Sequence, residues 1–329
     1  MKAWIVKQWC EPAGMQFEEV ATPAPRAKQV RVKVEAAALN FLDTLIIKGQ
    51  YQFKPPFPFT PGVEVAGTIE AVGEGSRFKP GMRVCGNIST GGYATHALLD
   101  DGAVAPIPDN LDFASASALP IVYPTAHLCL KDAGRMQPGE TVLVHAGAGG
   151  VGLAAIQLAK AWGAGKILAT AGSAAKLKVC LDEGADAAFD YSIPGKEDAW
   201  VDQVKEATGG KGADIIIDMV GGRIAEQSMR VLNWRGRFIV VGFAGGTIPS
   251  LAANRLLLKA ASAIGVFWGE TAKREPATVQ TVFGDLFRLL AEGKIKPVVT
   301  NSYKLSHAPQ AMIDLATRKT FGKVVLVPD

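Results

Sequence analysis

The stretch TVLVHAGAGGVGLAAIQLAKAW, residues 141–162, is the most informative segment of this 329-residue chain about its fold. It begins with an apolar strand pattern, passes through Gly147, Gly149 and Gly152, and continues as an amphipathic helix pattern. In this arrangement Gly147 allows a tight turn, Gly149 leaves backbone room for a pyrophosphate, and Gly152 allows close packing of the helix on a sheet. The helix N-terminus offers free N–H groups and a partial positive charge to phosphates.

The stretch therefore predicts a dinucleotide-binding turn. A tight strand-to-helix turn without a ligand is the alternative. The expected cofactor-binding residues of the turn are Gly147, Ala148, Gly149, Gly150, Val151 and Gly152.

Strand and helix patterns alternate from about residue 121 to residue 293. The helix patterns cover 151–162 and 174–183 among others, and the strand candidates are 141–145, 166–170, 187–190, 214–219, 238–241 and 264–267. Such alternation predicts βαβ units, hence a parallel sheet covered on both faces.

The segments on either side of this region have a different pattern. Residues 30–35 alternate apolar and charged side chains, which is typical of a half-buried strand, and turns rich in Pro and Gly follow. The tail returns to short strands, so we expect it to complete the first domain. The predicted domains are 1–122 with 294–329, a compact β-barrel or sandwich, and 123–293, the dinucleotide-binding domain.

The end of the second strand of the nucleotide domain indicates NADPH rather than NADH. An NAD site places an acidic residue about 20 residues after the glycines, and no acidic residue is within reach there. Ser173 and Lys176 instead supply a hydroxyl and a positive charge suited to a 2′-phosphate. Tyr191 comes directly after the third strand of the nucleotide domain and could close the same pocket. Alternatively, Ser173 is a helix N-cap and Lys176 a solvated side chain.

Composition excludes several classes of function. The net charge of +4 is spread without runs, which argues against nucleic-acid and membrane-surface partners. No apolar run approaches the roughly 18 residues of a membrane span, and no secretory signal is present, so we expect a cytoplasmic protein. The four cysteines lack any C-x2-C pair and are interpreted as reduced packing residues.

The chain resembles the medium-chain dehydrogenase/reductase superfamily, and more narrowly its zinc-independent quinone oxidoreductase (zeta-crystallin-like) branch. The resemblance covers nearly the whole chain. Besides the glycine turn, it rests on AALNFLD (37–43), FTPGVEVAG (59–67), GMRV (81–84), LP (119–120) and GKVVL (322–326). It implies an α/β fold in which a doubly wound Rossmann sheet accompanies a GroES-like β-barrel domain.

Departures from the zinc alcohol dehydrogenases bear on the chemistry. Asn40 stands where those enzymes have a catalytic Cys, and Val63 where they have a His before Glu64. Zinc catalysis needs three protein ligands, which Glu64 alone cannot provide. The four-Cys lobe for structural zinc is missing, and no ligand-like spacing joins His96, His127, His145 and His307. We expect no metal.

Without a Lewis acid, hydride donation to an electron-poor acceptor is favoured over alcohol dehydrogenation. The resemblance implies NADPH-dependent reduction of a quinone or an α,β-unsaturated carbonyl compound. It also implies that Asn40, Tyr51 and Thr125 are catalytic residues, which line a cleft between the two domains. The plainer interpretations are that Asn40 satisfies nearby backbone groups, that Asp43 lies in a surface turn or salt bridge, and that Tyr51 is a packing residue.

Further cofactor contacts are expected after the fifth and sixth strands, at Gly242, Phe243, Phe267 and Trp268. The aromatic residues among them could equally belong to the core. Arg318 and Lys323 could reach the 2′-phosphate side or belong to a solvated basic face. By resemblance, residues 261–267 pair across the axis of a homodimer.

Two alternative functions remain. The first is an enoyl-thioester reductase, although only Lys48 and Lys54 lie near Tyr51 to attract such a substrate. The second, of another class, is an NADPH-responsive binding or structural protein without turnover. The intact glycines of the phosphate turn argue against the second alternative. The sequence also lacks the basic stripe with aromatic residues that RNA binding would require. The preferred partner is a small electrophilic substrate, with no nucleic acid and no membrane.

Overall fold

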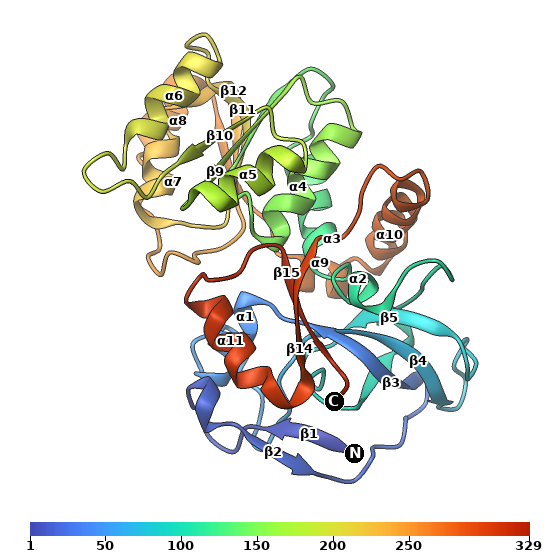
Figure 1. Ribbon diagram of the computed structural model, residues 1–329. Coiled ribbons are helices and arrows are strands. Elements are labelled where there is room, and N and C mark those ends of the chain that lie inside the picture. Colours follow the sequence, from blue (N-terminus) through green and yellow to red (C-terminus); the bar gives the residue numbers. More distant parts are fainter. The chain divides into compact units, whose positions relative to one another are not determined.

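The computed structural model describes all residues from Met1 to Asp329. The chain divides into two compact units. The first unit comprises Met1–Ile121 and Pro297–Asp329, and the second comprises Val122–Lys296. Each unit has its own main sheet (Figure 1). Each also has its own buried core.

The second unit is built on a six-stranded, entirely parallel sheet with the order β10-β9-β8-β11-β12-β13. Its strands are β8 (Thr141–Val144), β9 (Lys166–Ala171), β10 (Ala187–Asp190), β11 (Ala213–Asp218), β12 (Leu232–Val240) and β13 (Ser262–Gly265). The chain runs outward from β8 to β10, then returns to place β11 on the other side of β8. This reversal defines the doubly wound order of a Rossmann sheet, and the predicted fold of this region is confirmed.

Helices alternate with these strands, as the sequence pattern predicts. They are α3 (Val122–His127), η3 (Leu128–Ala133), α4 (Gly150–Ala161), α5 (Ala174–Asp182), α6 (Ala199–Ala207), α7 (Gly222–Ser228), α8 (Ala253–Lys259), α9 (Trp268–Arg274) and α10 (Pro276–Ala291). Trp200 of α6 and Phe238 of β12 are fully buried in a cluster with Leu143 of β8. The helices therefore cover apolar strands that carry few charges.

Two strand predictions differ from the structure. β12 begins at Leu232 rather than at 238. Its first, polar part contains a bulge, where Arg235 has a φ of +56° and the register between β11 and β12 shifts. The bulge interrupts the alternation of side chains by which a strand is recognised in the sequence. The last strand spans Ser262–Gly265 rather than 264–267, since Phe267 is the N-cap of α9 and Trp268 its first residue.

The first unit contains a mostly antiparallel sheet with the order β14-β15-β3-β4-β5-β7, in which β6 pairs with β3. Its strands, with those of the small β1–β2 sheet, are β1 (Lys2–Ile5), β2 (Gln16–Glu19), β3 (Gln29–Ala38), β4 (Glu64–Val72), β5 (Arg83–Asn87), β6 (His96–Asp100), β7 (Val104–Pro106), β14 (Val299–Lys304) and β15 (Lys323–Val327). Val325 of β15 pairs with Ala38 of β3, so the C-terminal tail completes this sheet.

Short helices connect the strands of the first unit. They are η1 (Pro12–Gly14), α1 (Phe41–Ile47), η2 (Asp101–Ala103), α2 (Phe113–Ser117), η4 (Leu305–His307) and α11 (Ala308–Ala316). Buried side chains of α1 and α11, including Ile47 and Met312, join the core of the sheet. These helices thus hold the returning tail against the N-terminal strands.

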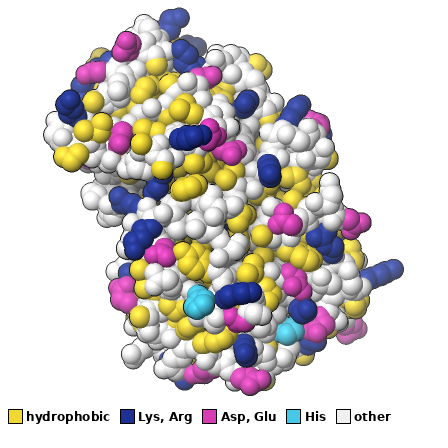
Figure 2. Space-filling model, viewed as in Figure 1, with side chains coloured by type: hydrophobic (Ala, Val, Ile, Leu, Met, Phe, Trp, Pro, Cys, Tyr) yellow, Lys and Arg dark blue, Asp and Glu magenta, His cyan; other side chains and the backbone are white.

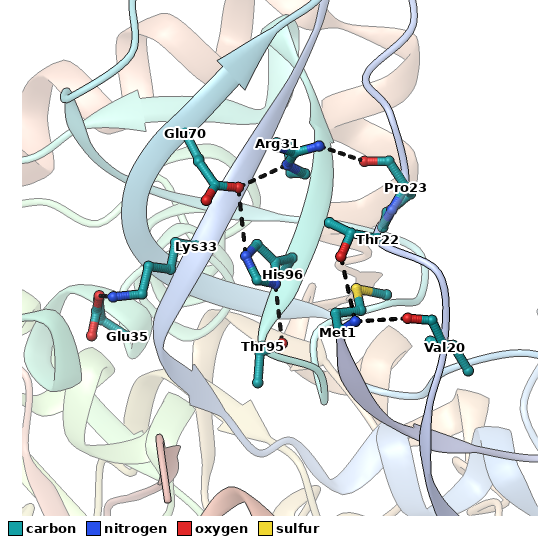
Figure 3. A network of polar contacts seen from close by, with 10 residues as sticks. All are labelled: Met1, Val20, Thr22, Pro23, Arg31, Lys33, Glu35, Glu70, Thr95 and His96. Carbon is teal, nitrogen blue, oxygen red and sulfur yellow. Dashed lines mark hydrogen bonds and ion pairs between the residues drawn. The ribbon is translucent and has the colours of Figure 1, made fainter.

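A partly exposed polar network ties together three strands of this sheet (Figure 3). Arg31 of β3 donates to Glu70 of β4 at 2.9 Å, and Nε2 of His96 on β6 lies 3.5 Å from the same carboxylate oxygen. A partly exposed Arg–Glu pair of this kind contributes about 0–1 kcal/mol, and burial lowers the pKa of His96, which disfavours its charged form. The network therefore links three strands that already pair through their backbones, and it adds little to stability.

Charged side chains of both signs are interspersed on the visible surfaces of the two units (Figure 2). None of the helices combines the length and the apolarity that a membrane crossing requires.

Candidate active site

The glycine turn is held in place by a buried histidine directly after β8. His145 is fully buried, with Nδ1 2.7 Å from Oγ1 of Thr170 and Nε2 2.8 Å from Oγ of Ser228. Burial lowers the pKa of His145 to about 3, so its ring is neutral at physiological pH. A neutral ring between two hydroxyl groups links the end of β8 to β9 and α7 and fixes where the turn begins.

The turn has no room for side chains at two of its glycines. A Cβ at Gly152 would lie 2.5 Å from the carbonyl oxygen of Ala146, and a Cβ at Gly147 would lie 2.9 Å from Ala169 Cβ. The residue in a left-handed conformation is Ala146, with a φ of +47°. The roles expected of two glycines are therefore exchanged: Gly147 allows close packing on β9, whereas Gly152 allows the turn to close on its own backbone.

The same turn leads into a helix whose N-terminus is suited to bind phosphate groups. Gly149 is the N-cap of α4 in an extended conformation, and α4 is long enough to direct N–H groups and a partial positive charge at its N-terminus. The N–H groups in the first turn of α4 lack helical acceptors, so they are the donors that phosphate oxygens would use.

Three of the predicted cofactor residues follow the ends of β9 and β10: Ser173 and Lys176 at the start of α5, and Tyr191 directly after β10. Ser173 is the N-cap of α5 and accepts a hydrogen bond from the backbone N–H of Lys176, 3.4 Å away. A Cβ at Gly172 would lie 3.5 Å from Cε2 of Tyr191, so the tyrosine lies beside the start of α5. The structure thus brings Ser173, Lys176 and Tyr191 to one corner of the sheet.

One acidic residue close to that corner, Asp190, belongs to β10. Oδ1 of Asp190 accepts hydrogen bonds from the backbone N–H and the hydroxyl of Ser192, at 2.7 and 2.6 Å. Ser192 also donates to the carbonyl of Gly172, 3.2 Å away. The carboxylate is thereby held by its own turn, and the end of β9 carries none.

The loops after β11 and β12 are joined by backbone hydrogen bonds. Ala244 N–H donates to Met219 O at 2.9 Å, and Gly245 N–H donates to Val220 O at 2.8 Å. A Cβ at Gly221 would lie 2.9 Å from Cδ1 of Phe243, whose ring is 37% exposed. Phe243 therefore lies partly exposed, directly after Gly242, on a loop that backbone hydrogen bonds hold in place.

Asp218 stabilises these loops from the end of β11. It is fully buried and accepts hydrogen bonds from the N–H groups of Val220, at 2.9 Å, and Gly221, at 3.0 Å. Burial raises the pKa of Asp218 to about 6, although the two N–H groups oppose the rise.

The two aromatic residues near β13 differ in burial. Phe267 is 49% exposed, whereas Trp268 is 4% exposed and lies 6.3 Å from the ring of Phe283. Trp268 packs in the core, in agreement with the plainer interpretation. Contact of Phe267 with a nicotinamide ring stays a prediction.

A buried polar cluster, formed by Asn40, Asp43, Glu64, Tyr93 and Lys323, lies at the end of the central strands of the first unit. Glu64 begins β4 and Lys323 begins β15, and both strands flank β3, whose end precedes Asn40. The pairing of the three strands therefore places these side chains together.

Lys323 is the centre of this buried polar cluster. Its Nζ donates to Glu64 Oε1, to Asn40 Oδ1 at 2.8 Å and to the carbonyl of Leu39 at 2.9 Å. Lys323 is 4% exposed. The expectation that Lys323 reaches a phosphate or belongs to a solvated basic face is wrong, because its ammonium group is satisfied inside the first unit.

Asn40 connects the ion pair to α1. Its Nδ2 donates to Glu64 Oε1 at 2.8 Å, and its backbone N–H donates to Oδ2 of Asp43 at 2.8 Å. Burial raises the pKa of Glu64, and the nearby charge of Lys323 opposes the rise. Asn40 is 9% exposed, more than Glu64 or Lys323, so it is the member of this trio nearest to solvent.

Asp43 is buried, not part of a surface turn. Besides Asn40, it accepts a hydrogen bond from the hydroxyl of Tyr93, 2.9 Å away, while its Oδ1 has no hydrogen-bond partner. Burial raises the pKa of Asp43 to about 7, which the hydrogen bonds from Asn40 and Tyr93 partly offset. Asp43 therefore titrates near neutral pH.

The remaining predicted residues are distributed between the units. Tyr51 is half-buried against the core of the first unit, and burial together with the charge of Asp43 raises the pKa of its phenol. Arg318 follows α11 in a left-handed conformation, with a φ of +61°. Thr125 is 7% exposed on α3 of the second unit. Pairings of these residues across the two units stay predictions.

Sequence reasoning missed Asp43, Tyr93 and Lys323 as members of the buried polar cluster. One signal could have found them: Glu64 lies between Val63 and Val65 at the start of an apolar strand, and a buried carboxylate requires a cationic or donor partner. Lys323 begins a second apolar strand and is the matching cation.

Each of the two units matches a known protein family. Residues 26–109 match the alcohol dehydrogenase GroES-like domain family and residues 150–284 match the zinc-binding dehydrogenase family. The fold and these matches define a medium-chain dehydrogenase/reductase.

Relatives narrow the assignment. The chain is 39% identical to quinone oxidoreductase-like protein 2 of Rattus norvegicus over 313 residues, which are 95% of this chain and 88% of that protein. It is 40% identical to quinone oxidoreductase of Rattus norvegicus over 331 residues, 99% of this chain and 98% of that protein. The solved structure of Escherichia coli quinone oxidoreductase complexed with NADPH superposes with a TM-score of 0.91 at 30% identity, covering both chains in full. The chain belongs to the quinone oxidoreductase branch of the medium-chain dehydrogenases/reductases.

Proposed function

We propose that this protein is an NADPH-dependent oxidoreductase that reduces quinones or α,β-unsaturated carbonyl compounds without zinc. The observation that carries the proposal is the buried polar cluster. At the position where the related zinc dehydrogenases have metal ligands, this chain has the Asn40 amide, the apolar Val63 and a carboxylate already paired with Lys323. An amide N–H is suited to stabilise negative charge on a substrate oxygen.

The preference for NADPH rests on the corner formed by Ser173, Lys176 and Tyr191. The N-cap hydroxyl accepts from the backbone of Lys176 and keeps its own hydrogen for a phosphate oxygen. The lysine ammonium adds a positive charge, and Arg318 is a second candidate cation. The structure of the Escherichia coli relative with NADPH supports the same choice.

When bound, NADPH supplies a hydride; with that hydride and one further proton, a quinone becomes a hydroquinone. The chain's part is to bind the phosphates at α4, to orient the acceptor, and to hold a donor near the developing oxyanion. Asn40 is the proposed donor, with Tyr51 and Thr125 as further substrate contacts. Gly242, Phe243 and Phe267 are proposed to flank the nicotinamide.

We further propose that the protein is a homodimer joined through β13. The strand is at the edge of its sheet, so one side of its backbone lacks a neighbouring strand. Leu257 and Leu258 of the adjacent α8 are 80% and 72% exposed. A second copy of the chain would cover both features.

A cytoplasmic location is proposed on the state of the cysteines. Cys85, Cys129 and Cys180 are buried and unpaired. Free buried thiols are typical of a reducing compartment.

The acceptor class is tested by measuring NADPH oxidation with a quinone, an α,β-unsaturated ketone and an enoyl-CoA at equal concentrations. A higher kcat/KM for the quinone or the ketone supports the proposal. A higher kcat/KM for the enoyl-CoA would favour an enoyl-thioester reductase instead.

A further inference from the structure

We propose that Lys323 and Glu64 are positioning residues, which fix the orientation of the Asn40 amide so that one of its hydrogens is held for the substrate oxygen. The inference rests on the proposed function, because it takes Asn40 as the group that contacts substrate. It adds two residues of the first unit to the machinery of that site.

An asparagine amide can be turned by half a rotation with little change in shape, since its oxygen and nitrogen are nearly equal in size. In this cluster the two orientations are not equivalent. Oδ1 faces the ammonium of Lys323, and Nδ2 faces the carboxylate of Glu64, both at 2.8 Å. Reversal would place the amide hydrogens against the ammonium and the amide oxygen against the carboxylate.

Burial makes that reversal costly. The side chains of Lys323 and Glu64 are 5% and 0% exposed, so water cannot compensate for the two mismatched contacts. The third hydrogen bond of the ammonium, to Leu39 O at 2.9 Å, anchors the cation to the end of β3. The ion pair therefore selects one orientation of the amide.

The selected orientation leaves a donor for the reaction. Nδ2 carries two hydrogens, and the bond to Glu64 uses one. The second belongs to the residue of this trio with the largest exposed fraction. Because Oδ1 accepts from a cation, the amide is also polarised toward stronger donation.

A double-mutant cycle tests the inference. Asn40→Ala should lower kcat about 10²-fold, as loss of an oxyanion donor does. Lys323→Met should lower kcat about 10-fold or more through misorientation of the amide. NADPH affinity should stay unchanged in both, and Asn40→Ala/Lys323→Met should be no slower than Asn40→Ala. Lys7→Met, which breaks the exposed pair with Glu18, is the matched control.

The outcomes separate the inference from the proposed function. Additive losses, or an unchanged kcat in Lys323→Met, would overturn the positioning role while leaving the reductase intact. An unchanged kcat in Asn40→Ala would overturn both the role of Asn40 and the inference. If Lys323→Met does not fold, Glu64→Gln/Lys323→Met, which leaves no unpaired buried charge, replaces it in the cycle.

A second measurement does not depend on turnover. In protein labelled with ¹⁵N-asparagine, the Asn40 side-chain signals are those lost in Asn40→Ala. One Nδ2 hydrogen should exchange with solvent much more slowly than the other, and Lys323→Met should abolish the difference. Equal exchange of both hydrogens in the unmutated protein would overturn the inference even if no acceptor is reduced.

Discussion

The hydroxyl of Tyr93 donates a hydrogen bond to Oδ2 of Asp43 across 2.9 Å in the interior of the first unit. Tyr93 is held there by Gly62, whose φ of +94° and missing Cβ let the ring lie against the backbone. The pair attaches the start of α1 to the loop before β6. It also ties the stability of the first unit to pH.

The pKa of Asp43 is raised to about 7 in the folded protein, against about 4 in an unfolded chain. The folded state therefore binds more protons between these values, and the contribution of Asp43 to stability is lost as pH rises from about 4 to about 7. Asp43→Asn should flatten the pH dependence of the free energy of unfolding in this window. Denaturant titrations at several pH values measure it.

Asp182→Asn is the control for this experiment, because Asp182 is 55% exposed and pairs with Lys178 on the surface of α5. It should leave the pH dependence as it is. If Asp43→Asn and the unmutated protein show the same pH dependence of the free energy of unfolding, Asp43 does not titrate in this pH window.

Lys176→Ala should weaken NADPH binding about 10- to 100-fold, since a charge-assisted hydrogen bond contributes about 1.5–3 kcal/mol. NADH has no 2′-phosphate, so its affinity should change little. Calorimetric titration with each nucleotide measures both effects. Lys178→Ala, two residues along the same helix, should change neither; equal weakening of both nucleotides by Lys176→Ala would remove the 2′-phosphate role.

Gly152→Ala should reduce NADPH affinity and lower the free energy of unfolding by about 1–3 kcal/mol. The reason is the backbone oxygen of Ala146, 2.5 Å from the added Cβ, which must move and distort the phosphate turn. Gly284→Ala on α10 meets no atom within 4 Å and should stabilise instead, by about 0.5–1 kcal/mol. Unaltered nucleotide binding in Gly152→Ala would contradict the geometry of the turn.

Tyr51→Phe should lower kcat/KM for a quinone about 3- to 10-fold, the effect of losing one hydrogen bond, and leave NADPH affinity unchanged. Steady-state kinetics measure the first quantity and a binding titration the second. Tyr303→Phe, which loses a hydrogen bond to Asp314 on the same unit, is the control. If kcat/KM does not change, Tyr51 only packs against the core.

Leu257→Lys/Leu258→Lys should convert a dimer into a monomer, because two charges would be buried in the contact proposed for α8 and β13. Light scattering after size exclusion gives the mass of each species. Leu181→Lys, on the exposed face of α5, should leave the mass unchanged. A dimer that survives the double substitution would place the interface elsewhere.

The parallel sheet could be predicted from the sequence because its apolar strands and its helices each have a recognisable local pattern. The first part of the strand that begins at Leu232 does not follow from the sequence, because a bulge at Arg235 interrupts the strand pattern. The corner at Ser173 and Lys176 follows from residues close in sequence. The buried polar cluster does not, since Lys323 and Glu64 are 259 residues apart and meet only through strand pairing.

The exchange of roles between Gly147 and Gly152 has a similar cause. Their spacing predicts a phosphate turn, but which neighbour each glycine avoids depends on Ala169 of β9 and on the carbonyl of Ala146. Such contacts belong to the assembled sheet rather than to the motif.

NADPH oxidation by the purified protein with a simple quinone, with NADH in a parallel reaction, is the decisive test of the proposed function. We expect catalytic turnover with NADPH, a markedly lower kcat/KM with NADH, and no loss of activity after treatment with a metal chelator. Absence of turnover with quinone and enone acceptors, while NADPH still binds, would contradict the proposed function and leave a nucleotide-binding protein without reductase activity.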